Sequence, residues 1–120
     1  MEESKEQKGY YAVIFTSIQT SVTRGYAMAA QHLEDLAKQM PGFIGIEHAR
    51  NEVGITISYW ETLEDIARWK AETDHQAAQI KGKNTWYEEY TVRICKVERE
   101  YSFSKQQEQS KIELKKKFLL

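Results

Sequence analysis

The chain has 120 residues, of which 41% are hydrophobic and 12% aromatic, and its formal net charge at pH 7 is −1. This length and composition are typical of one globular domain and exclude a disordered chain. The near-neutral charge excludes strong electrostatic attraction to nucleic acid or to an anionic membrane surface. No apolar run approaches the roughly 20 residues that span a bilayer.

The ends of the chain and its single cysteine indicate a cytoplasmic domain with short extensions. Residues 1–9 are charged and predict a flexible leader without the basic and apolar regions of a signal peptide. Cys95 cannot form an internal disulfide, so nothing requires an oxidising compartment. Residues 104–120 form a charged extension that is compatible with a docking helix, a disordered segment or an expression remnant. The domain itself is expected over residues 10–103.

The first half of the domain predicts a strand followed by a helix. Residues 10–19 are β-branched and aromatic, which favours a strand. Hydroxyl side chains in residues 20–23 are able to cap a helix. Apolar residues recur at helical spacing over residues 24–40, and Pro41-Gly42 ends this helix.

Two strands joined by a hairpin come next. Side chains alternate over residues 43–50 and again over residues 55–60. Between them, residues 51–54 predict a short loop in which Gly54 takes the left-handed conformation.

Two capping patterns predict a second helix with a break in it. Thr62 and Asp65 resemble a capping box at its start, and Leu63, Ile66 and Ala67 are expected to point inward. A second pattern, Thr73 with Gln76, predicts a restart near residue 73 and a helix that ends at about Lys81.

The remaining residues predict an aromatic loop and a last strand. Residues 85–87 form the loop, and residues 90–103 form the strand. The apolar phase of this strand shifts between Ile94 and Cys95, which predicts a β-bulge there.

The order β-α-β-β-α-β predicts an α+β fold of the ferredoxin-like type, with one antiparallel sheet and both helices on one face. Strands one and three carry bulky apolar residues in both alternation sets, such as Val13 and Ile14. A sheet that is apolar on both faces needs a second cover, and no further helix is available. We therefore expect a homodimer whose sheets pack face to face.

Three segments, taken in order, resemble the antibiotic biosynthesis monooxygenase family. They are residues 41–47 (PGFIGIE), residues 60–69 (WETLEDIARW) followed by His75, and residues 97–101 (VEREY). The resemblance covers about residues 10–103 and implies a dimeric α/β barrel built on a ferredoxin-like protomer. It identifies the fold more specifically than the reaction.

The resemblance implies several chemistries. Members of the family include cofactor-independent oxygenases of polycyclic phenols, quinol oxygenases and haem-degrading enzymes. Trp69 and His75 match a tryptophan and an iron-ligating histidine of the haem-degrading branch. That branch also uses an asparagine on the first strand, where this chain has none, and a longer spacing between tryptophan and histidine. Both departures count against haem degradation.

Six residues are candidates for the functional site. His75 is the candidate base or ligand, with Asp74 beside it to orient the ring, or it is a histidine with only local hydrogen bonds. Trp69 either lines a pocket or belongs to the core, and packing is the stronger interpretation for Trp60. The substrate-binding candidates are Trp60, Trp86, Tyr87 and Phe15. Trp86 and Tyr87, in the predicted aromatic loop, either contact a ligand or close the edge of the dimer.

No metal site is expected, because His32, His48 and His75 fall on different elements. His32 and His48 are expected at the surface or at an interface. Two functions remain open. The first is a monooxygenase that oxidises a small aromatic molecule, a phenol or a quinol, without a bound organic cofactor. The second is a stress protein without turnover that holds haem or another hydrophobic ligand, or whose pocket is filled by its own side chains.

Overall fold

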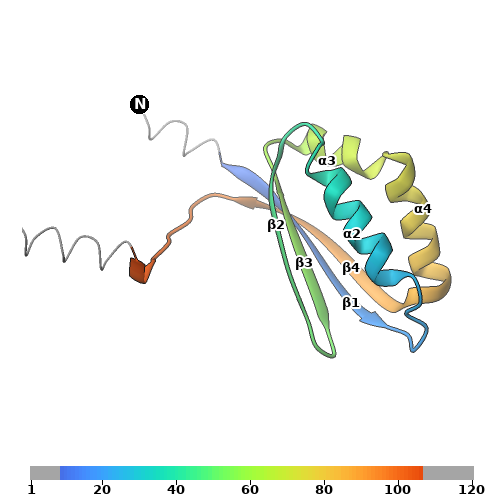
Figure 1. Ribbon diagram of the computed structural model, residues 1–120. Helices are drawn as coiled ribbons and strands as arrows, with labels where there is room; N and C mark the ends of the chain where they lie inside the picture. Colours follow the sequence, from blue (N-terminus) through green and yellow to red (C-terminus); the bar gives the residue numbers. More distant parts are fainter. Residues whose placement is uncertain (1–8, 107–120) are drawn as a thin grey trace, which may run out of the picture.

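The structure, a computed structural model, describes residues 9–106 of the chain, and the predicted order of elements is confirmed (Figure 1). The second helical region is divided in two, as the capping patterns predict. The elements are β1 Tyr10–Gln19, α2 Tyr26–Ala37, β2 Phe43–Arg50, β3 Gly54–Trp60, α3 Leu63–Lys70, α4 Thr73–Lys81, a π-helical turn Gly82–Trp86, and β4 Tyr87–Val97.

The four strands form one antiparallel sheet in the order β2-β3-β1-β4, which is the ferredoxin-like arrangement. The predicted α+β fold class is therefore confirmed. In an antiparallel pair, opposed side chains point to the same side of the sheet, so the register defines rows that run across all four strands.

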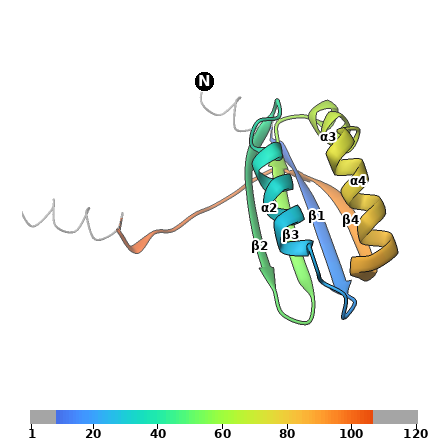
Figure 2. The same cartoon turned by 45° about the vertical axis from the view of Figure 1, so that its right-hand side comes forward.

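Within residues 9–106, helices α2, α3 and α4 lie on one face of the sheet. Helix α2 covers the side of β2 and β3, and α3 and α4 lie on the side of β4 (Figure 2). The core lies beneath them and is built around four buried residues, Ala37, Trp60, Ile66 and Trp69. Partly buried side chains of β1, β2 and α2 pack against this core, among them Tyr11, Val13, Leu33, Leu36, Met40 and Phe43.

The opposite face of the sheet, called here the open face, is not covered by any element of residues 9–106 (Figure 1). The register places Ile14 of β1 and Ile57 of β3 at its centre. Ile55 on the same face is 41% exposed. The two apolar faces that the sequence predicts are therefore present, and one of them lacks a cover within the described part of the chain.

Three predictions about the last strand are wrong. Trp86 ends the π-helical turn and Tyr87 begins β4, so residues 85–87 are not a loop. Pairing with β1 continues without a shift at Ile94 and Cys95, and the irregularity lies at Ile18/Gln19 instead. The alternation of apolar residues shifts between Ile94 and Cys95 because apolar side chains of β4 point to both faces of the sheet. Pairing ends at Val97, so residues 98–103 lie outside the strand.

Two predictions about the turns also need correction. Gly54 is the first residue of β3 and does not have a positive φ, whereas Gly42 does, with φ 79°. Helix α2 ends at Ala37, before Pro41, because the chain tightens there. Met40 N donates to Ala37 O over only three residues, at 3.0 Å.

The start of α3 is capped as predicted. Asp65 N donates to Thr62 Oγ1 at 3.1 Å, and the Thr62 hydroxyl donates to Asp65 Oδ2 at 2.8 Å. This arrangement turns the Asp65 side chain inward, so Asp65 is buried and Leu63, expected to point inward, is 49% exposed. Ala67 is also exposed, and only Ile66 of the three expected residues is buried.

The cap of α4 differs from the prediction. The N-cap is Glu72 rather than Thr73, and Glu72 Oε1 accepts from Asp74 N at 2.6 Å and from His75 N at 3.1 Å. A carboxylate at the N-terminus of a helix satisfies free N–H groups and interacts favourably with the helix dipole.

Both predicted extensions fall almost entirely outside the described residues, which begin at Gly9 and end at Gln106. After Val97 the chain leaves the sheet and runs away from the body (Figure 1). Tyr101 and Phe103 on this segment are exposed. Within residues 9–106, no helix is long and apolar enough to span a membrane.

Candidate functional site

Three rings, Trp60, Trp69 and His75, form a stack that links the end of β3 to the start of α4. The ring centroids of Trp60 and Trp69 are 5.9 Å apart, and those of Trp69 and His75 are 4.4 Å apart with planes at 13°. Trp60 is 0% exposed and Trp69 is 8% exposed. The indole N–H of Trp60 donates to Ser58 Oγ at 2.9 Å. Both tryptophans in this ring stack therefore belong to the core, and His75 is its half-buried end.

The protonation state of His75 follows from its surroundings. His75 Nδ1 lies 3.1 Å from the carbonyl oxygen of Trp69. A carbonyl only accepts, so Nδ1 carries the proton and Nε2 is the basic nitrogen. Burial lowers the pKa of His75 below its usual value, although the bond to Trp69 opposes this effect. The imidazole is therefore neutral near pH 7.

Asp74 does not orient His75, which corrects the prediction. Asp74 Oδ2 lies 2.9 Å from Nε2 of His32 and so connects α4 to α2. Adjacent residues on a helix do not face each other, so the Asp74 carboxylate points away from the neighbouring imidazole. The backbone carbonyl of Trp69 takes the orienting role. His32 and His48 are both exposed, as predicted.

A second aromatic group lies toward the other end of β1 and is called here the tyrosine cluster: Phe15, Tyr26, Tyr87 and Tyr90. The Phe15 ring stacks on Tyr90 at 5.0 Å and meets Tyr87 edge-on at 5.4 Å. Tyr26 of α2 meets Tyr87 edge-on at 5.8 Å. Edge-to-face and offset-stacked rings at these distances stabilise one another.

A cation and a hydrogen bond complete the tyrosine cluster. The guanidinium carbon of Arg50 lies 5.8 Å from the centre of the Tyr26 ring, and Arg50 Nη2 donates to Ser17 Oγ at 2.6 Å. The Tyr87 hydroxyl donates to the Tyr26 hydroxyl at 3.1 Å. Burial raises the pKa of Tyr87 well above its usual value, so its phenol stays protonated.

Trp86 is a buried support for the tyrosine cluster. Its ring is 6% exposed and meets Tyr26 edge-on at 5.5 Å. Its indole N–H donates to the carbonyl oxygen of Arg24 at 3.0 Å. Trp86 therefore fixes the start of α2 against the π-helical turn.

Two exposed aliphatic residues of β4, Val92 and Ile94, lie between the ring stack and the tyrosine cluster. They are 44% and 52% exposed, and they are called here the β4 strip. Val92 pairs with Phe15 of the tyrosine cluster, and Ile94 pairs with Val13. Val13 packs on the core that holds the two stacked tryptophans. The β4 strip is therefore an apolar surface on the helix side of the sheet that links the two aromatic groups.

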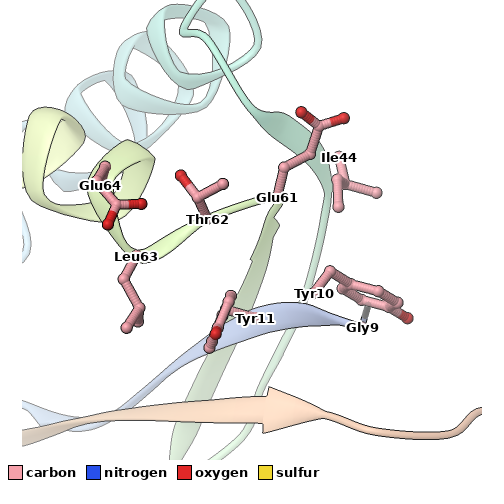
Figure 3. Close-up of a pocket in the computed structure, with 8 residues that line it drawn as sticks. All are labelled: Gly9, Tyr10, Tyr11, Ile44, Glu61, Thr62, Leu63 and Glu64. Carbon is pink, nitrogen blue, oxygen red and sulfur yellow. The ribbon is translucent and has the colours of Figure 1, made fainter. Parts of the chain in front are cut away.

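A hollow of about 650 Å³ opens at the end of the sheet where β1 begins and β3 ends (Figure 3). Tyrosine rings and exposed aliphatic side chains form its walls, and two glutamates give it an acidic rim. The lining residues are Gly9, Tyr10, Tyr11, Ile44, Glu61, Thr62, Leu63 and Glu64. None of the six predicted site residues lines this end hollow.

The structure thus divides the predicted residues between two places. Trp60, Trp69 and His75 come together in the ring stack. Phe15 and Tyr87 come together in the tyrosine cluster, and Trp86 packs against it. The sequence interpretation missed Tyr26, Tyr90 and Arg50, and the aromatic character of Tyr26 and Tyr90 was the only local signal. The described residues contain no group of three or more potential metal ligands.

Comparison with known proteins agrees with the fold and the motifs. The model of the family described as "Antibiotic biosynthesis monooxygenase" matches residues 10–81. The uncharacterized protein YqjZ of Bacillus subtilis (strain 168) is 45% identical over 96 residues, which cover 78% of this chain and 84% of YqjZ.

Solved structures share the fold at low sequence identity. SnoaB, a cofactor-independent oxygenase from Streptomyces nogalater, matches with a TM-score of 0.68 and 8% identity, over 79% of this chain and 99% of SnoaB. Rv0793 from Mycobacterium tuberculosis matches with a TM-score of 0.69 and 8% identity, over 78% of this chain and 99% of Rv0793. At such identities the similarity concerns the fold alone.

Proposed function

Because the chain belongs to the antibiotic biosynthesis monooxygenase family, we propose that it oxidises a small electron-rich aromatic molecule, a phenol or a quinol, without a bound organic cofactor. The observation that carries this proposal is the state of His75. The Trp69 carbonyl holds the ring in one tautomer, burial keeps it neutral, and Nε2 remains basic. These are the properties that a general base requires near neutral pH.

The β4 strip is the proposed binding surface for the substrate. Val92 and Ile94 offer an apolar surface between the ring stack and the tyrosine cluster. An aromatic ring that lies there exchanges water contacts for aliphatic and aromatic ones. Arg50 beside Tyr26 supplies a positive charge at the cluster end, which stabilises a substrate anion.

The proposed reaction balances without an external reductant. His75 Nε2 accepts the phenolic proton, and the phenolate that results is electron-rich enough to reduce O₂. One oxygen atom enters the ring as a carbonyl, and the other leaves as water with two hydrogens from the substrate. A phenol and O₂ thus give a quinone and water, and the substrate supplies all four electrons.

Oxygen uptake with a naphthol and a naphthoquinol, without added reductant or cofactor, tests this proposal. We expect one O₂ consumed per substrate, and the loss of turnover in His75→Ala and His75→Gln. His32→Gln is the matched control, because His32 is exposed and lies outside the ring stack. Unchanged turnover in both His75 variants would contradict the assignment of the base.

A second candidate function follows from the packing of the tryptophans. Trp60, Trp69 and Trp86 are all buried, and the end hollow does not reach His75. This arrangement supports a second function, that of a protein without turnover in which its own side chains fill the space between the helices and the sheet. Haem has one feature in its favour, because ligating histidines usually donate their other N–H to a carbonyl or carboxylate.

A haemin titration followed in the Soret band separates these functions. A saturable shift that His75→Ala abolishes would support haem binding, and bleaching after a reductant is added would indicate haem oxidation. No shift, together with oxygen uptake, would support the phenol or quinol oxygenase.

We further propose a cytoplasmic location, because Cys95, the one cysteine of the chain, is an exposed free thiol.

A further inference from the structure

The end hollow, which the proposed reaction does not use, combines apolar walls with a negatively charged rim. It does not reach His75, so a ligand held there is distinct from the substrate. We propose that the end hollow binds a small organic cation, an ammonium group attached to an aromatic or aliphatic body. This inference does not rest on the proposed reaction.

The aliphatic walls of the end hollow come from two elements that are distant in the sequence. In Figure 3, Leu63 of α3 lies on one side, and Tyr10 of β1 and Ile44 of β2 lie on the other. Leu63 and Ile44 are each 49% exposed, so both present aliphatic surface to the solvent inside the hollow. An apolar ligand body that lies between them removes this surface from water, which favours binding.

Tyr10 and Tyr11 add two aromatic walls. Successive side chains of a strand point to opposite faces of the sheet, so the two rings stand on either side of β1. Gly9 before them contributes only backbone to the lining. Its φ is 69°, and a Cβ there would lie 2.7 Å from the carbonyl oxygen of Val97. A cation near the face of either ring is attracted by the π electrons of that ring.

Glu61 and Glu64 form the rim of the end hollow. Both residues are exposed, and within residues 9–106 neither takes part in an ion pair. Lys96 of β4 pairs with Tyr11, but it is not among the residues that line the hollow. The two carboxylates therefore attract a positive ligand and repel an anion.

The state of Tyr10 is an independent indication of negative charge at this end of the sheet. Its hydroxyl donates to Glu100 Oε2 at 2.9 Å. Burial raises the pKa of Tyr10, and the hydrogen bond and the charges of Glu100 and Glu47 raise it further. The phenol therefore stays neutral, and its surroundings favour positive charge.

The size and lining of the end hollow are typical of a site for a small organic molecule. Its volume of about 650 Å³ lies within the usual range for such sites, roughly 300–1,000 Å³. The lining sets two carboxylates against aromatic and aliphatic side chains, whereas hard metal ions take oxygen ligands throughout. An amine with two fused rings fits this volume, with its rings against the walls and its ammonium group toward the rim.

Isothermal titration calorimetry of the full chain with tryptamine tests the proposal. Two indoles of similar size are the comparison: 3-ethylindole, which is neutral, and indole-3-propionate, which is an anion. We expect saturable binding of tryptamine, with a Kd at least about tenfold lower than that of 3-ethylindole, and no saturable heat with the anion. Equal affinity for tryptamine and 3-ethylindole would overturn the proposal, and so would tryptamine that does not bind.

Substitutions in the rim and the wall locate the site. Glu61→Gln together with Glu64→Gln should raise the Kd at least about fivefold, since exposed ion pairs are individually weak. Tyr10→Leu keeps an apolar wall without π electrons and should raise the Kd about two- to fivefold. The matched control is Glu52→Gln with Glu88→Gln, which removes the same charge before β3 and near the start of β4, at the opposite end of the sheet. An equal rise in this control would contradict the proposed site.

Urea denaturation separates binding from a structural role of the rim. Glu64 lies in the first turn of α3, where a carboxylate interacts favourably with the helix dipole. If the variant with Glu61→Gln and Glu64→Gln loses stability but keeps the wild-type Kd for tryptamine, the rim is structural only and the proposal is wrong.

Amide NMR spectra of the full chain locate the ligand without any substitution. Tryptamine should shift the backbone amide signals of Gly9, Ile44 and Leu63 and leave those of Val92 and Ile94 in the β4 strip unchanged. Shifts that are centred on the β4 strip would overturn the proposal.

Discussion

Replacement of Trp60 decides whether the ring stack is core or the wall of a pocket. An aromatic side chain of this class buries roughly 150–250 Å², which at about 25 cal/mol/Å² corresponds to about 4–6 kcal/mol. Trp60 is 0% exposed, so it contributes this burial in full. Trp60→Phe retains most of the ring, loses roughly 1–2 kcal/mol of burial, and leaves the Ser58 hydroxyl without its donor. An unpaired buried group costs about 1–3 kcal/mol, so we expect a total loss of about 2–5 kcal/mol.

The free energy of unfolding is measured by urea denaturation, followed by far-UV circular dichroism because the substitution alters tryptophan fluorescence. The slope of the transition should remain constant, so that a shift in midpoint reports stability alone. Adding Ser58→Ala to Trp60→Phe removes the unpaired hydroxyl and should recover part of the loss. Val53→Ala in the exposed hairpin is the control, with an expected change within about 0.5 kcal/mol.

A small effect would refute the reasoning. If Trp60→Phe changes the free energy of unfolding by less than about 0.5 kcal/mol, the value typical of surface positions, then Trp60 is not packed in the core. The double variant would then show no recovery. That result would favour a solvent-filled pocket at Trp60, and the substrate surface would have to be placed there instead of on the β4 strip.

Three further predictions concern the same end of the fold. Gly42→Ala should destabilise by about 1–3 kcal/mol, because φ is 79° and a Cβ would collide with the Asp65 side chain. Gly45→Ala, with nothing near its Cβ, should be neutral, and equal urea midpoints for the two variants would contradict this account. Thr62→Ala should lose about 1 kcal/mol of cap stability that Thr62→Ser retains, and equal losses in denaturation would exclude the cap. The pKa of His75 in the folded state lies below its value of about 6.5 in the unfolded chain. Below about pH 6.5 the unfolded chain therefore binds more protons than the folded one, and the free energy of unfolding decreases as the pH falls. Between pH 7 and pH 5 the wild type should therefore lose more stability than His75→Gln, and parallel pH profiles would refute this.

The sequence predicts elements well where the signal is local. Strand β1 over residues 10–19 and strand β2 over residues 43–50 match the structure, because β-branched side chains and a Pro-Gly boundary define them within a few residues. The cap at Thr62 is equally local, since donor and acceptor are three residues apart. Alternation of side chains also identifies the two apolar faces of the sheet, because it depends only on the strand period.

Contacts between distant segments are what the sequence cannot supply. Asp74 appears beside His75 in the chain, but its partner is His32, forty-two residues earlier on α2. The end hollow is likewise built from the starts of β1, β2 and α3, whose proximity depends on the register of the whole sheet. The sequence singles out Trp60, Trp69 and His75 separately, but that their rings stack on one another depends on the position of α3 over β3.

The ring stack couples the stability of the fold to the state of the candidate base. Burial is the largest cause of the lowered pKa of His75, and the Trp69 ring lies over its face at 4.4 Å. Trp69 also supplies, through its carbonyl, the hydrogen bond that selects the tautomer. A change at Trp69 therefore alters the base even if the indole never touches a substrate. The loss of activity in a Trp69 variant thus identifies a positioning role when its pH profile moves toward that of a solvent-exposed histidine, and a contact with substrate when only KM rises.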